Sequence, residues 1–271
     1  MSDINKNPTV TKTTGLLPAI IKAFYSADLY REVARSWRRR SFLFLLVLLA
    51  IFWALVVVVK TVQGVAFINR IADQIPNLTI EQGELKAPRH QPYFIKNPDT
   101  GAVILVIDPS DQYKDFPTSS AMLMMDGNQL LYKVGNNNND IKSIPFDKST
   151  KIVITPDIIR AKVRHAAPLF AVLLWLFIAV ISYGFNLISA LIYGFLAMLF
   201  AQALKRSLDY GQALSLALVA IGPSIVFFLL FRLFDLAIPF AWLVLLLIQI
   251  AYIYAAVHVL PELTVRNNPK V

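Results

Sequence analysis

The chain contains no cysteine among its 271 residues. Disulfide bridges, cysteine-ligated zinc sites and thiolate nucleophiles are therefore excluded. Charged residues are also scarce, at 16% of the chain, where soluble domains have about 25%. The motifs of dinucleotide, nucleoside triphosphate, metalloprotease and serine hydrolase sites are missing, and three scattered histidines do not suggest a metal site. These absences predict a protein that is not an enzyme and that holds neither a metal nor a cofactor.

Apolar residues make up 56% of the chain and fall in two blocks. A bilayer core about 30 Å thick needs about 20 helical residues, so long uncharged apolar runs predict membrane spans. The first block predicts a transmembrane helix over 42–62, and the second predicts a transmembrane helical block over 166–260. The expected fold class is an α-helical integral membrane protein, with a small β-rich extracytoplasmic domain inserted after the first helix.

The number of spans depends on residues 168–204. As one helix this segment is about 55 Å long, and as two short spans it turns near Gly184. Positive residues concentrate on the cytoplasmic side of membrane proteins. One helix places four of the five later basic residues inside, and two spans place one inside; the five are Lys205, Arg206, Arg232, Arg266 and Lys270. We therefore expect four spans with both termini cytoplasmic, and five spans are the alternative.

Most of the net charge of +9 precedes the first span. Residues 1–41 hold 8 Lys and Arg against 3 Asp and Glu, whereas residues 70–165 hold 12 against 11. This distribution indicates a cytoplasmic anchor that also attracts anionic lipid, formed by Arg35, Arg38, Arg39 and Arg40. It does not favour nucleic-acid binding, which requires basic charge on a recognisable reader domain.

The segments that flank the first span have different compositions. Residues 1–15 are polar and are expected to be disordered. Residues 261–271 form a C-terminal tail. Residues 16–41 carry an apolar residue every four positions, at Tyr25, Leu29, Val33 and Trp37, which predicts an amphipathic cytoplasmic helix. Such a helix either lies on the membrane or packs against the protein's own cytoplasmic loops.

The polar segment over 70–160 has the signature of strands. Short β-prone runs occur at 102–108, 121–125, 129–134 and 151–155, separated by Pro, Asn, Gly and Asp. Asp126-Gly127-Asn128 predicts a hairpin turn between the middle two runs, and 136–139 a polar loop tip. The aromatic residues of this segment are expected to form a small core, with a sugar-stacking face as the alternative.

Polar residues inside the apolar block are costly in lipid and are therefore candidate functional residues, namely Asn186, Gln202, Gln249 and His258. Arg232 and Asp235 are three residues apart and form a candidate pair at a helical hairpin. These residues serve either as contacts between helices or as the polar path of a transporter. No charged residue lies at the centre of a span, which disfavours ion-coupled transport.

Three stretches resemble an uncharacterised bacterial multi-pass membrane family, a domain of unknown function that includes maltodextrin-utilization proteins. They are FYSADLYREVARSWRRRSF before the first span, QIPNLTIEQGEL followed by VILVID, and LDYGQALSLALVAIGPSIV near the end. The last stretch also resembles, more loosely, the Yip1-type membrane superfamily, with Gly222-Pro223 where a Thr-Pro is expected. The resemblance implies a multi-pass envelope protein, accessory to sugar uptake, without catalytic residues.

We therefore expect a non-enzymatic accessory or scaffold in the bacterial cytoplasmic (inner) membrane. Its expected partners are the lipid bilayer and other envelope proteins, and self-association is compatible with the sequence. The alternative is a small-solute transporter or channel component that uses the polar residues of the C-terminal block.

Overall fold

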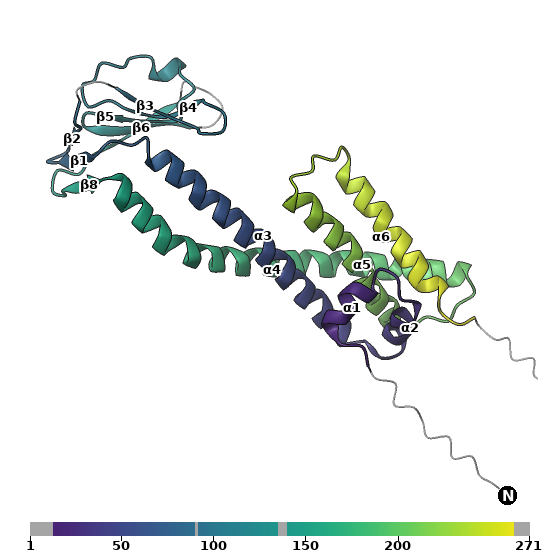
Figure 1. Ribbon diagram of the computed structural model, residues 1–271. Coiled ribbons are helices and arrows are strands. Elements are labelled where there is room, and N and C mark those ends of the chain that lie inside the picture. Colours follow the sequence, from purple (N-terminus) through teal and green to yellow (C-terminus); the bar gives the residue numbers. More distant parts are fainter. Residues whose placement is uncertain (1–12, 90–91, 135–139, 263–271) are drawn as a thin grey trace, which may run out of the picture. The chain divides into compact units, whose positions relative to one another are not determined.

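The computed structural model describes residues 13–89, 92–134 and 140–262 (Figure 1). Contacts divide the chain into a helical unit, Met1–Val59 with Leu173–Val271, and a sheet unit, Lys60–Val172. Nearly all of the expected disordered N-terminus and of the C-terminal tail, and the whole expected loop tip at 136–139, lie outside the described residues.

Six helices occur in the described part of the chain. Their bounds are α1 (Leu16–Lys22), α2 (Ala27–Ser36), α3 (Arg40–Ala72), α4 (Pro156–Ala203), α5 (Tyr210–Leu233) and α6 (Ala241–His258). The last four of these are long and apolar enough to cross a membrane, by length and composition. Helix α4 is continuous for 48 residues, so the turn near Gly184 that five spans require does not occur.

Eight strands form two sheets in the described part of the sheet unit. They are β1 (Leu78–Glu81), β2 (Glu84–Lys86), β3 (Tyr93–Lys96), β4 (Val103–Ile107), β5 (Leu123–Asp126), β6 (Gln129–Lys133), β7 (Ile141–Pro145) and β8 (Ile152–Ile154). One sheet has the order β2-β1-β8 and the other has the order β3-β4-β5-β6-β7. All pairs are antiparallel except β4 with β5, whose crossover contains the short 3-10 helix η1 (Phe116–Thr118).

The expected fold class, an α-helical integral membrane protein with a small β-rich domain inserted after the first helix, is wrong. Six helices together with eight strands in two sheets make a mixed α/β fold in the described part of the chain. The apolar helices are candidate spans, and they are not the whole architecture. The error arose because long apolar runs dominate the hydropathy pattern, whereas strands of three to five residues contribute little to it.

The N-terminal segment forms two helices instead of the expected single helix over 16–41. Ser26 caps α2 by accepting a hydrogen bond from the Leu29 backbone nitrogen at 3.3 Å. The apolar face of α2 is buried against the helical unit's own core, whereas Tyr25 is exposed. Of the two alternatives for this segment, the structure shows packing against the protein itself.

Helix α5 lies at the centre of the helical unit, between α6 and α2. Every residue from 215 to 225 is buried, so α5 has no face left for solvent or lipid along this stretch. Small residues allow the close approach: a Cβ on Gly222 would lie 3.3 Å from the Phe44 ring of α3. A Cβ on Gly194 of α4 would lie 3.3 Å from the Leu214 Cα of α5.

Apolar clusters lie on both faces of the five-stranded sheet, and each cluster covers part of its face. On one face, Ile95 and Ile107 pack with Leu78, Ile80 and Leu85 of the three-stranded sheet. On the other face, the residues that meet the β4–β5 crossover form a second cluster, with Val106, Phe116, Ala121 and Met124. Most of the aromatic residues of the segment thus contribute to cores, as expected.

Candidate functional site

The candidate intramembrane polar residues are not assembled into one site. Asn186 donates its amide to the Ser182 carbonyl of its own helix at 2.8 Å. Gln202 and His258 are exposed, and Gln249 is partly buried without a side-chain hydrogen bond to any described residue. Among the described residues, no hydrogen bond joins any two of these four side chains.

The candidate hairpin pair, in contrast, lines one pocket. Arg232 near the end of α5 and Asp235 just after it border a cavity of about 310 Å³ beside the start of α6. The Arg232 guanidinium lies 5.1 Å from the centre of the Phe228 ring, a cation–π contact. Apart from Arg232 and Asp235, the lining is apolar. Arg232 and Asp235 are therefore the only polar side chains that the described lining of this cavity presents to a ligand.

Three segments that are distant in sequence meet in what we call the basic junction: α2 with its C-terminal arginines, the α4–α5 loop and the end of α6. Arg31 donates its Nε to the Val259 carbonyl at 3.0 Å. Arg38 pairs with Asp209 at 3.1 Å, and Arg206 pairs with Glu262 at 3.2 Å. The junction thus ties together the beginning, the middle and the end of the helical unit.

The predicted anchor residues all belong to this junction or adjoin it. Arg40 stacks on Trp37 at 5.3 Å from the ring centre. Arg35 and Arg39 are exposed and have no hydrogen bond or ion pair with any described residue. The anchor therefore contains two engaged and two available guanidinium groups.

Hydrogen bonds hold two carboxylates of this region in their ionised form. The Gln212 backbone N–H, together with Arg38, lowers the pKa of Asp209, which caps α5 in a capping box. Burial alone would raise the pKa of Glu32, but bonds from Thr14 and Trp37 outweigh it and lower that pKa. Both groups are anionic at neutral pH and fix the helices around the basic junction.

In the sheet unit, one apolar surface remains uncovered. Pairing between β5, β6 and β7 places Leu123 opposite Tyr132 and Leu130 opposite Ile144, all on one face. Leu123 is 41% exposed and Ile144 is 53% exposed. The three-stranded sheet packs mainly on the β3–β4 part of this face and also meets Met125 of β5, but none of these four residues belongs to that cluster. We call these four residues the open face.

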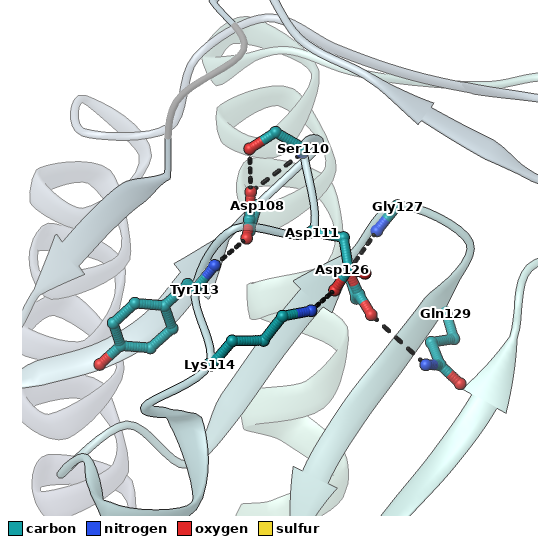
Figure 2. A network of polar contacts seen from close by, with 8 residues as sticks. All are labelled: Asp108, Ser110, Asp111, Tyr113, Lys114, Asp126, Gly127 and Gln129. Carbon is teal, nitrogen blue, oxygen red and sulfur yellow. Dashed lines mark hydrogen bonds and ion pairs between the residues drawn. The ribbon is translucent and has the colours of Figure 1, made fainter.

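The crossover between β4 and β5 is organised by Asp108, which is fully buried (Figure 2). Its carboxylate accepts bonds from the Ser110 nitrogen at 2.9 Å, the Ser110 hydroxyl at 2.7 Å and the Tyr113 nitrogen at 2.7 Å. Burial opposes ionisation of this group, but these bonds outweigh burial and lower its pKa. The sequence analysis missed this residue, although an Asp-Pro-Ser sequence after an apolar run is a turn signal.

A shallow polar groove of about 430 Å³ lies beside this turn and includes Asp111 and Asp126. Figure 2 shows that both carboxylates are already engaged, Asp111 with Lys114 at 2.7 Å and Asp126 with the Gly127 nitrogen at 2.8 Å. In the described part of the chain, no group of three or more Asp, Glu or His side chains could hold a metal ion. The Asp111 and Asp126 carboxylates of the groove thus stabilise the turns that carry them.

The described residues thus form a helical unit with apolar helices and the basic junction, and a sheet unit with the open face. The chain matches the family described as "Protein of unknown function (DUF1189)" over residues 18–257. Because the match covers most of the chain, the protein belongs to this family, in agreement with the resemblance to a domain of unknown function. Neither the curated proteins nor the solved structures contain a match to the chain.

Proposed function

We propose that the protein is a non-enzymatic scaffold of the bacterial cytoplasmic membrane, which holds a partner protein through its sheet unit. The support for a membrane location is the surface of α4. Eleven large apolar side chains of this helix are exposed within the helical unit: Leu173, Leu176, Phe177, Val180, Ile181, Phe185, Ile188, Leu191, Ile192, Phe195 and Leu199. Water-soluble monomers rarely expose contiguous apolar surface on this scale, and lipid would cover it.

The basic junction supports an orientation with the N-terminus in the cytoplasm. Two candidate spans separate α2 from the α4–α5 loop, and two more separate this loop from the end of α6. An even number of crossings returns the chain to the same side, as the contacts of Arg31, Arg38 and Arg206 require. The positive charge of this side favours the cytoplasm, so residues 70–160 would be extracytoplasmic.

The finer part of the resemblance supports an accessory role. The family that the three sequence stretches resemble is multi-pass and includes maltodextrin-utilization proteins, and the looser Yip1-type likeness is also to a membrane superfamily. We include a link to sugar uptake in the proposal on this basis. The carrier alternative receives no support from Asn186, Gln202, Gln249 and His258, because they do not form a joint site.

The open face is the observation that carries the proposal of a protein partner. Leu123 and Ile144 expose aliphatic carbon at the middle and the edge of the five-stranded sheet, and neither belongs to an apolar cluster of the sheet unit. Exposed apolar residues rimmed by polar side chains mark sites of protein association. Lys142 lies beside them on the same face, opposite Tyr132, and gives this surface a polar rim.

Site-specific photo-crosslinking in intact cells tests this proposal. A photoreactive residue at Ile144 should capture one discrete protein, and Leu123→Glu should abolish that product. The matched control is Ser143, which is exposed on the opposite face of the same strand and should not give the product. Identical products from both positions, or none, would refute partner binding at this face. Arrest of solute movement into vesicles by Asn186→Leu alone would establish the carrier instead.

A further inference from the structure

A small pocket lies within the basic junction, between α2, the α4–α5 loop and the chain just after α6. Its polar lining consists of Arg31, Arg35, Ser207 and Gln212, and Ala34 and Leu260 contribute aliphatic surface. Its volume is about 90 Å³. A water molecule occupies about 30 Å³ of liquid, and pockets for drug-sized ligands measure about 300–1,000 Å³. The pocket therefore suits a compact group and is too small for a sugar or a nucleotide.

The polar lining consists almost entirely of hydrogen-bond donors. Arg35 has no partner among the described residues, so its whole guanidinium group is available. The Gln212 side-chain oxygen already accepts from the Asp209 nitrogen at 3.0 Å, which leaves its amide N–H groups available to the pocket. Ser207 adds a hydroxyl group. A ligand for such a lining must supply acceptors and negative charge.

The carboxylates near the pocket already have partners, and one of them pairs with the pocket residue Arg31. Asp28 pairs with Arg31 at 2.8 Å, Asp209 pairs with Arg38 while it caps α5, and Glu262 pairs with Arg206. No described carboxylate contacts Arg35, so its charge remains uncompensated by the protein. An arginine fork without a carboxylate partner matches the geometry of a tetrahedral oxyanion.

We propose that this pocket binds a phosphate group, with Arg35 as its principal ligand. The phosphate belongs either to the headgroup of an anionic membrane lipid or to a free phosphate in the cytoplasm. The lipid source rests on the proposed membrane location, because only then does the pocket lie at the level of the headgroups. The free-phosphate source depends on the pocket alone, so the two ideas can fail separately.

The test compares Arg35→Gln with Arg39→Gln in the full-length protein. Both changes remove one exposed arginine of the same cluster, but only Arg35 lines the pocket. In a neutral detergent, thermal unfolding is followed against millimolar inorganic phosphate, with chloride at equal ionic strength as the control. In a second arm, native mass spectrometry counts retained phosphatidic acid against phosphatidylcholine.

The wild type and Arg39→Gln should bind the phosphate compound alike, and Arg35→Gln should bind it about tenfold more weakly or worse, because hydrogen bonds to charged groups are strong. Binding of inorganic phosphate identifies a free-phosphate site, and retention of phosphatidic acid alone identifies a lipid site. If Arg35→Gln does not fold, Arg35→Lys replaces it, and the loss of the planar fork should still weaken binding. An equal loss in both Gln variants, or no binding in either arm, overturns the proposal.

Discussion

A single buried carboxylate controls the conformation of the β4–β5 crossover. Asp108 accepts three hydrogen bonds shorter than 3 Å from Ser110 and Tyr113. Asp108→Asn replaces one carboxylate oxygen with an NH2 group. This group would face an N–H or O–H donor of Ser110 or Tyr113 that now lacks an acceptor, at a cost of about 1–3 kcal/mol. Hydrogen exchange of the β4 and β5 amides should accelerate about tenfold or more. The control is Asp147→Asn, which changes an exposed residue of another turn and should leave the exchange of these amides nearly unaffected.

The acid sensitivity of the sheet unit follows from the same group. The folded-state pKa of Asp108 lies below its ordinary value of 3.8, so its stabilising contribution is complete above pH 3.8. This contribution is lost as the pH falls from 3.8 through the lowered pKa. In Asp108→Asn, the exchange protection of the β4 and β5 amides, after correction for intrinsic exchange rates, should depend less on acid pH than it does in the wild type. Equal acid dependence would contradict the assignment.

The deep polar side chains are expected to matter little for folding. Asn186 bonds to Ser182 of its own helix, and Gln249 has no side-chain bond to a described residue. Asn186→Leu and Gln249→Leu should each change stability by about 1 kcal/mol or less, since neither side chain forms a hydrogen bond to another described helix. Thermal unfolding in detergent measures this. A large loss in either variant would reveal a structural role that these contacts do not explain.

Among the elements, the α4–α5 crossing depends on one glycine. A side chain at Gly194 would meet the Leu214 backbone, and the Tyr210 hydroxyl already donates to the Leu191 carbonyl at 3.2 Å. Gly194→Leu must push the helices apart or unfold one of them, at a cost of about 1–3 kcal/mol or more. Gly184→Leu on the same helix is the matched control, because no atom lies within 4 Å of its Cβ. The prediction fails if both variants unfold at the same temperature.

The elements also show which part of the fold the sequence could predict. The apolar runs at 102–108, 121–125, 129–134 and 151–155 coincide with β4, β5, β6 and β8, and the hairpin turn at Gly127-Asn128 is confirmed. Strands β1, β2, β3 and β7 were missed because each carries Lys, Glu or Pro and therefore lacks a continuous apolar run. The parallel β4–β5 pair was missed because alternation shows which face is buried and not which strand is adjacent.

The contacts of the candidate site residues with distant parts of the chain could not be predicted from the sequence either. The arginine cluster was predicted as an anchor from its charge, but its contact with the α4–α5 loop joins residues 171 positions apart. Local patterns carry no information about such a contact. The break before α2 could have been predicted, because Ser26 followed by Ala27-Asp28 is a helix-start signal.

For the whole molecule, charge and chain path support the same proposed topology. The excess positive charge precedes α3, whereas residues 70–165 are nearly neutral, with 12 basic and 11 acidic residues. The basic junction then gathers α2, the α4–α5 loop and the end of α6 in one place. A four-span path is the simplest that satisfies both observations, with the continuous α4 as its second span.

The absence of cysteine makes this topology directly testable. Single cysteines replace Gln112 in the β4–β5 crossover, Ala237 between α5 and α6, and Ser207 between α4 and α5; all three positions are exposed. An impermeant thiol reagent on cells, with any outer membrane permeabilised, should label positions 112 and 237 and spare 207 until the cells are lysed. Because two spans separate 112 from 237, these two must behave alike. Labelling of 207 in intact cells would invert the orientation, and labelling of all three positions only after lysis would refute extracytoplasmic exposure of the sheet unit.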